Sequence, residues 1–169
     1  MEQLKTTRKN MRLKAYDYSQ NGAYFITICV KDKHEMLSEV VGAIINRPQN
    51  PEPYVELSEY GDVVDKAINE IPYYYKNVAV DKYVIMPNHI HMILVVDSFD
   101  NDGRLIIAPT SNISTIIQQF KRHVTKQIGF SLWQQSFHDH IIRNEADYQS
   151  IWQYIDENPQ KWEEDFYYK

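Results

Sequence analysis

The sequence has little of several features that mark particular classes of protein. Its single cysteine, Cys29, excludes an intrachain disulfide and a zinc site built from cysteines, and it suits a reducing cytoplasm. The N-terminus has no apolar signal core, and no apolar run is long enough to span a bilayer, so we expect no membrane partner. The net charge of −5 also lacks the positive sign that is typical of nucleic-acid binders.

The distribution of charge says more than its sum. The N-terminal arm, residues 1–15, is basic, and a second basic cluster consists of Lys121, Arg122, His123 and Lys126. The C-terminal end is acidic, with Glu157, Glu163, Glu164 and Asp165. The simplest interpretation of the acidic end is a solvated surface, and we expect the tail, residues 159–169, to be one.

The apolar pattern predicts a single mixed domain over residues 1–169. β-Branched and aromatic runs predict strands at 23–30, 36–41, 54–57, 78–86, 89–96 and 136–143. Helical periodicity predicts one helix after Ser58, one after residues 111–114 that ends at Gly129, and one from Asn144 to about Asn158. This order is that of an α+β, ferredoxin-like β-α-β-β-α-β domain with an antiparallel sheet, an inserted β-hairpin and a C-terminal helix. We expect the helices on one face of the sheet.

Two histidines open the apolar run that follows the Pro87-Asn88 turn. His89 and His91 are two residues apart, so in a strand both side chains project from the same face. Paired imidazoles on a rigid strand can provide two ligands for a divalent metal, although a histidine on a sheet face is more often structural. A second pair, His138 and His140, offers an alternative metal site, and we favour a supporting role for it.

Tyr154 and Asn158 share one face of the last predicted helix, because residues four apart lie one turn from each other. On spacing alone, a core tyrosine followed by a capping asparagine is the better explanation of this pair. The remaining tyrosines, including Tyr148, Tyr167 and Tyr168, are expected to pack or to lie on the surface.

Several motifs together resemble those of a known family. Pro87-Asn88-His89-Ile90-His91 is similar to the histidine–hydrophobic–histidine (HUH) motif of single-tyrosine transposases. The resemblance to their REP-associated branch extends along most of the chain: Tyr16-Asp17-Tyr18, Tyr24-Phe25-Ile26-Thr27, Phe120-Lys121, Asp139-His140-Ile141-Ile142-Arg143, and Tyr154-Ile155 followed by Asn158-Pro159.

The resemblance implies metal-dependent cleavage and strand transfer of single-stranded DNA that contains hairpins, through a 5′-phosphotyrosine intermediate. It makes Tyr154 the nucleophile and His89, His91 and Asn158 the ligands of Mg²⁺ or Mn²⁺, with His140 close behind them. Many mobile relatives have glutamine where this chain has Asn158. Such an enzyme works in the cytoplasm, on the nucleoid when it is bound to DNA, as a monomer or a homodimer.

The contacts with DNA and the biological role are less constrained. Phosphate contacts and base stacking are expected from Arg12, Lys14, Tyr16 and Tyr18 in the arm, and phosphate contacts from Lys121 and Arg122. A domesticated protein that binds hairpins without cleaving them is the main alternative function. A relaxase or replication initiator is a third, but those enzymes usually carry larger domains.

Overall fold

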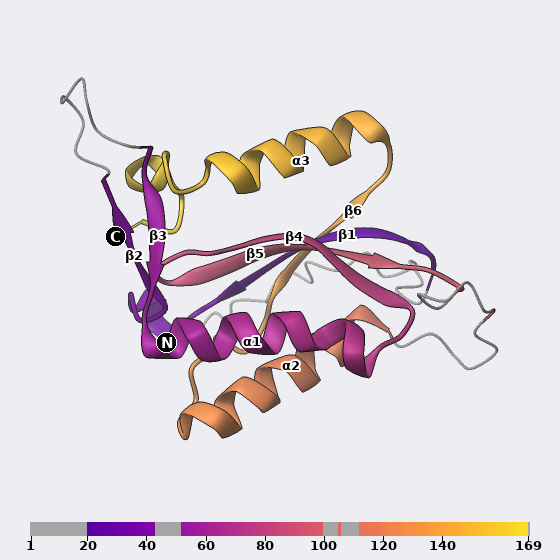
Figure 1. Cartoon of the computed structure of the whole chain (residues 1–169), viewed down its shortest axis with the longest axis horizontal. Coiled ribbons are helices and arrows are strands. Elements are labelled where there is room, and N and C mark those ends of the chain that lie inside the picture. Colours follow the sequence, from indigo (N-terminus) through magenta and orange to yellow (C-terminus); the bar gives the residue numbers. More distant parts are fainter. Residues whose placement is uncertain (1–19, 43–51, 100–104, 106–111, 169) are drawn as a thin grey trace, which may run out of the picture.

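The computed structural model describes residues 20–42, 52–99, 105 and 112–168, and Figure 1 shows their arrangement. The main sheet has four antiparallel strands in the spatial order β4 (Val78–Ile85), β5 (His89–Val96), β1 (Gly22–Cys29) and β6 (His138–Ile142). Three α-helices accompany it: α1 (Glu59–Tyr74), α2 (Ile113–Ile128) and α3 (Glu145–Glu157). Two short 3-10 turns, Lys31–Lys33 and Trp162–Glu164, follow β1 and α3.

The predicted fold class is confirmed. β1, α1, β4, β5, α2 and β6 follow one another as a β-α-β-β-α-β unit, and β5 lies between β1 and β4 in the sheet. The predicted hairpin is the separate two-stranded sheet of β2 (Ser38–Val41) and β3 (Tyr54–Leu57), inserted between β1 and α1. Every predicted strand limit lies within two residues of the observed one, which is the usual scatter at element ends.

The helix limits follow from local chemistry. Ser58 caps α1, because its hydroxyl oxygen accepts a hydrogen bond from the Gly61 amide at 3.1 Å. A Cβ atom at Gly61 would lie 2.1 Å from the carbonyl oxygen of Leu37, so glycine allows α1 to start directly against the preceding chain. Gly129 ends α2 in the left-handed conformation with φ 88°, as its position after the helical pattern predicts.

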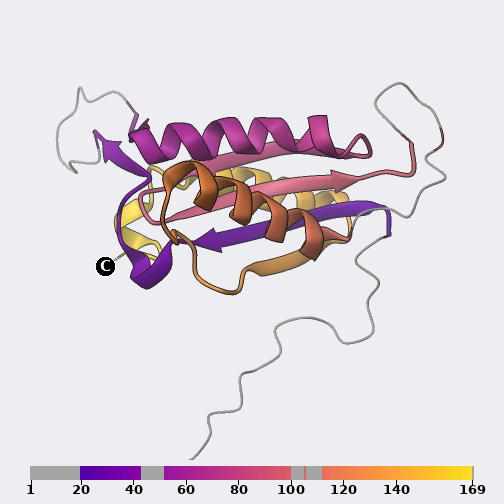
Figure 2. The same cartoon turned by 90° about the horizontal axis from the view of Figure 1, so that it is seen from below.

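The two faces of the sheet differ in chemistry. Alternate residues of β1 and β5 point toward α1 and α2 and form the apolar core, which includes Tyr24, Ile26, Ile28, Ile90, Met92 and Leu94. Figures 1 and 2 show α1 and α2 together on this face. The helix α3 covers the opposite face (Figure 1), so the expectation that all helices share one face is wrong.

The face beneath α3 carries the histidines. Cross-strand partners share a face, and the pairs Thr27–His91 and Cys29–His89 therefore project toward α3. This face of the sheet is covered by fewer buried apolar side chains, because Ile155 is the only residue of α3 that is buried. In the described part of the chain, no helix has both the length and the apolar character needed to cross a membrane.

Candidate metal and tyrosine site

The β4–β5 hairpin places both histidines at the start of β5. Pro87 and Asn88 make the connection, and the Met86 amide donates to the His89 carbonyl oxygen across the turn at 2.8 Å. Both imidazoles are buried, with 0% of His89 and 1% of His91 exposed. Their ring centroids are 4.5 Å apart. The i, i+2 spacing therefore produces the adjacent pair that it predicts.

Hydrogen bonds orient each ring through its Nδ1 atom. His89 Nδ1 lies 2.9 Å from Asn88 Oδ1, an acceptor, so this nitrogen carries the proton and Nε2 keeps its lone pair. His91 Nδ1 lies 2.8 Å from the Thr27 hydroxyl on the neighbouring strand. Partners of this kind on the far nitrogen are typical of metal-binding histidines.

The helix α3 brings Tyr154 and Asn158 to the histidines. The Tyr154 hydroxyl lies 3.3 Å from His91 Nε2, and its ring packs edge-on against Phe25 of β1. Asn158 ends the helix one turn later and is 1% exposed. The sequence requires this helix face to reach the histidine strand if the four residues form one site, and the structure shows that it does within one chain.

Two buried atoms of this cluster have no hydrogen-bond partner among the described residues. They are His89 Nε2 and Asn158 Oδ1, both of which carry free lone pairs. An unpaired polar atom in the interior costs free energy, so each such atom requires an explanation. A nitrogen and an oxygen lone pair left unpaired in one buried cluster match the ligand types of a divalent cation, and the residues therefore fit the metal site that the sequence motifs imply.

The C-terminal segment closes over this cluster, which the sequence pattern did not predict. Asp165 Oδ2 accepts hydrogen bonds from the Tyr154 hydroxyl at 3.3 Å and from Asn158 Nδ2 at 3.1 Å. The Tyr167 ring lies over His89 with centroids 4.5 Å apart. The expectation of a solvated acidic end is therefore wrong for Asp165. The signal that could have indicated docking is the group of aromatic residues, from Trp162 to Tyr168, beside those acids.

Burial controls the protonation of the cluster. It lowers the pKa of His89 to about 4 and the pKa of His91 well below its usual value, and the charge on His89 lowers the latter further. Burial and the nearby Asp165 carboxylate raise the pKa of the Tyr154 hydroxyl to about 12. Near neutral pH the site therefore contains two neutral imidazoles, ready to bind a cation, and a protonated phenol.

These pKa shifts predict an acid-sensitive fold. The unfolded chain binds protons on His89 near pH 6.5, whereas the folded chain resists protonation until about pH 4, so the free energy of unfolding falls as the pH drops between these values. The expected loss from His89 is on the order of 3 kcal/mol at pH 4. Urea unfolding with EDTA at pH 7.5, 5.5 and 4.5 measures it. His89→Asn should flatten the slope, and an unchanged slope in that variant would contradict the assignment.

The other predicted site residues lie elsewhere. His140 binds Asp147 at the start of α3, with Nε2 2.9 Å from Oδ2, so any support that it gives the site passes through the helix. His138 and His140 belong to no cluster of three ligand groups within the described residues; His89, His91 and Asp165 do. Lys121 donates to the carbonyl oxygens of Gln134 and Ser136. Arg12, Lys14, Tyr16 and Tyr18 lie outside the described residues.

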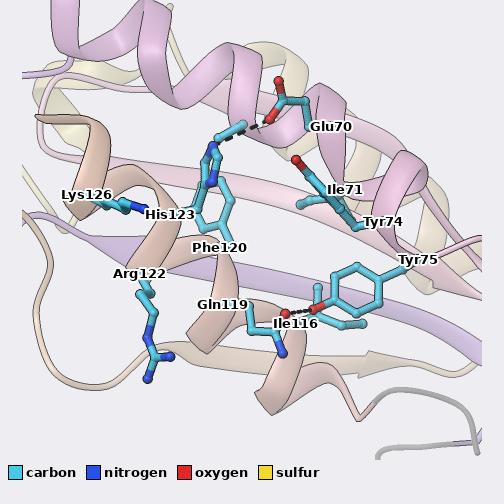
Figure 3. Close-up of a pocket in the computed structure, with 11 residues that line it drawn as sticks. Glu70, Ile71, Tyr74, Tyr75, Ile116, Gln119, Phe120, Arg122, His123 and Lys126 are labelled. Atoms are coloured by element: carbon cyan, nitrogen blue, oxygen red, sulfur yellow. Dashed lines mark hydrogen bonds and ion pairs between the residues drawn. The ribbon is translucent and has the colours of Figure 1, made fainter.

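A separate cavity of about 510 Å³ lies between α1 and α2, on the other face of the sheet (Figure 3). Its floor is apolar and includes Ile71, Ile116 and Phe120. Basic side chains of α2 line it, namely Arg122, His123 and Lys126. Hydrogen bonds and ion pairs link its two walls, from the Tyr75 hydroxyl to Gln119 Oε1 at 2.7 Å and from His123 to Glu70 at 3.5 Å.

Comparison with known proteins shows which proteins the chain resembles. No family model matches the chain. An uncharacterized protein of Haemophilus influenzae is 33% identical over 177 residues, covering 95% of this chain and 93% of its own length. A second protein of that organism, named "Putative REP-associated tyrosine transposase", is 25% identical and covers 86% of this chain and 74% of its own length.

A solved structure has the same fold. It is that of a REP-associated tyrosine transposase bound to a REP hairpin, and it matches with a TM-score of 0.61 at 21% identity, covering 89% of this chain and 73% of the solved one. With the HUH motif on β5 and a tyrosine within reach of it on α3, the chain is similar in sequence and in fold to REP-associated tyrosine transposases.

Proposed function

We propose that the protein cleaves single-stranded DNA next to a hairpin and transfers the cleaved strand, with Tyr154 as the nucleophile. The single observation that supports this best is the approach of the Tyr154 hydroxyl to within 3.3 Å of His91 Nε2, beside the unpartnered His89 Nε2 and Asn158 Oδ1. The relatives that match the chain include a transposase solved with a REP hairpin, which makes hairpin DNA the substrate of choice.

His89, His91 and Asn158 would hold the cation in this proposal, and Mg²⁺ or Mn²⁺ suits these ligands. When bound, it supplies positive charge that neutralises a phosphate oxygen. The chain's own residues fix the geometry. Thr27 and Asn88 orient the two imidazoles by hydrogen bonds, and α3 places the Tyr154 hydroxyl against His91 Nε2. The Tyr154 hydroxyl must lose its proton to act as a nucleophile, and its raised pKa opposes this loss. Positive charge added to the site would lower that pKa and so favour the phenolate.

The reaction exchanges one phosphodiester for another. The Tyr154 oxygen forms a bond to phosphorus, the bond from phosphorus to the 3′ oxygen breaks, and that oxygen leaves as a 3′-hydroxyl after it accepts a proton. The 5′-phosphotyrosine keeps the energy of the broken bond. A 3′-hydroxyl of another strand can therefore reverse the step and join the two strands, as strand transfer requires.

The test is a covalent adduct. Incubation with an oligonucleotide that carries a hairpin and a single-stranded flank, with Mn²⁺ or Mg²⁺, should give a protein–DNA complex that survives denaturant. Mass spectrometry should place the nucleotide on the peptide that contains Tyr154. Hairpin binding without an adduct in either metal would instead support the non-cleaving, domesticated alternative.

The cavity between α1 and α2 supports a DNA contact at Arg122. The helix α2 carries no acidic residue, and its exposed cations lie beside an apolar and aromatic floor, a combination that suits a phosphate and a base. Lys121 is committed to two carbonyl oxygens, so Arg122 and Lys126 are the better placed to bind phosphate. The single-stranded flank would then cross the edge of the sheet to reach Tyr154 on the other face.

This contact predicts a change in salt dependence. Arg122→Ala and Lys126→Ala should each weaken hairpin binding several-fold at low salt and reduce the slope of log affinity against log salt by about 1. Fluorescence anisotropy with a labelled hairpin measures both quantities. Lys66→Ala, which removes an exposed cation from α1, is the matched control and should leave the slope unchanged. Equal slopes in all three variants would exclude α2 as a phosphate contact.

A further inference from the structure

The C-terminal segment is fixed over the histidines by contacts of its own. Asn88 Nδ2 donates to the Tyr167 carbonyl oxygen at 2.8 Å, and Lys33 Nζ donates to the Phe166 carbonyl oxygen at 3.1 Å. Trp162 is 6% exposed and lies beside the His89 ring, with centroids 5.9 Å apart. These anchors reach both β5 and the turn after β1, so the segment has a defined position on the site.

That position brings one carboxylate to the unpartnered ligand atoms. Single ligand atoms of His89, His91 and Asp165 all lie within 4.8 Å of one another. Ligand atoms that surround an ion of Mg²⁺ size at about 2.1 Å are separated by roughly 3 to 4 Å. The three groups would therefore need only a small contraction to share one cation.

Charge provides an independent argument. His89, His91 and Asn158 are neutral ligands, and all three are almost fully buried, so a divalent cation held by them alone would keep its full charge in the interior. Hard cations prefer oxygen ligands, and a carboxylate adds both an oxygen and a compensating negative charge. Among the described residues, Asp165 is the only acidic member of the cluster that the histidines form.

We infer that Asp165 is a ligand of the divalent cation, so that metal binding fastens the C-terminal segment over the tyrosine site. This inference rests on the metal site proposed above. Asp165 Oδ2 already accepts from Asn158 Nδ2, and Oδ1 accepts from the Tyr167 amide at 2.7 Å, so the carboxylate is positioned before the cation arrives. It also occupies ligand space that a DNA phosphate oxygen needs, which makes phosphate and carboxylate competitors for the cation.

The test measures Mn²⁺ affinity of the full chain without DNA. Asp165→Asn should weaken Mn²⁺ binding at least tenfold in calorimetry or in titrations of free Mn²⁺ by electron paramagnetic resonance. An amide oxygen can still accept the hydrogen bonds of Tyr154 and Asn158, so a purely positioning role predicts unchanged affinity. Glu163→Gln removes an exposed carboxylate two residues away and should bind Mn²⁺ as the wild type does.

A second measurement follows the segment itself. Mn²⁺ should slow trypsin cleavage after the exposed Lys161 in the wild type and in Glu163→Gln, but not in Asp165→Asn. His89→Asn distinguishes failure of the Asp165 inference from failure of the proposed metal site. Loss of Mn²⁺ binding in His89→Asn, with wild-type binding in Asp165→Asn, would overturn the role of Asp165 and leave the metal site standing. Wild-type binding in His89→Asn would overturn the metal site itself.

Discussion

Tyr154→Phe should reduce the covalent adduct with hairpin DNA to below detection, a loss of at least about 1,000-fold, while the protein still folds and binds Mn²⁺. The substitution removes only the hydroxyl. The ring keeps its edge-on contact with Phe25. Two groups that contact the hydroxyl, His91 and Asp165, are also held by Thr27 and by the Tyr167 amide. The variant therefore isolates the chemistry from the structure.

Tyr167 is the matched control, because it is the other tyrosine at the site. Its ring lies 4.5 Å from His89, and burial raises the pKa of its hydroxyl to about 12, as for Tyr154. Its ring is farther from His91, at 5.9 Å against 5.2 Å for Tyr154. Tyr167→Phe should keep the adduct. An adduct that persists in Tyr154→Phe and disappears in Tyr167→Phe would transfer the nucleophile to the C-terminal segment.

The parts of the site that periodicity encodes could be predicted from the sequence. The spacing of His89 and His91 fixes their common face once the strand is recognised, and the four-residue spacing of Tyr154 and Asn158 fixes a common helix face. Asn144 caps α3 as predicted, its Oδ1 accepting from the Asp147 amide at 2.9 Å, which sets the register of the helix. No local pattern indicates that the strand with His89 and His91 meets the helix with Tyr154 and Asn158. That expectation depends on the order of the motifs along the chain, which resembles the order in the transposases.

The parts that depend on tertiary packing could not be predicted. The face of the sheet that α3 covers depends on contacts between α3 and β4, and these join residues about 70 positions apart. Asp165 lies in a short acidic run without periodicity, and it is half-buried between Trp162 and Tyr167, whose rings dock against His89. Lys121 matched a DNA-binding motif in sequence, yet the structure gives its ammonium two backbone acceptors.

Side-chain contacts hold the tyrosine helix α3 against β4 of the same chain. Lys82 of β4 forms an ion pair with Asp156 and lies over the Trp152 ring, 4.7 Å from its centroid. The Tyr148 hydroxyl hydrogen-bonds the Asp81 carboxylate one residue earlier on β4. Surface ion pairs contribute little singly, but these contacts act together on one short helix, along with the contact of Tyr154 with His91. They favour an arrangement in which Tyr154 lies against the histidines of its own subunit and not those of a partner.

Mixing two inactive variants distinguishes action within a subunit from exchange of helices between subunits. Tyr154→Phe keeps the metal ligands, His89→Asn keeps the nucleophile, and each is first shown to give no adduct alone. If α3 serves its own chain, the two variants refolded together still contain no complete site, and no adduct should form on hairpin DNA. If dimers exchange α3, half of a random equimolar mixture is mixed dimers with one complete site in two, which restores about a quarter of wild-type adduct. Restoration to that level would show that the docked α3 is exchanged between subunits in solution, and its absence would follow from the Lys82 and Tyr148 contacts that hold the helix in place.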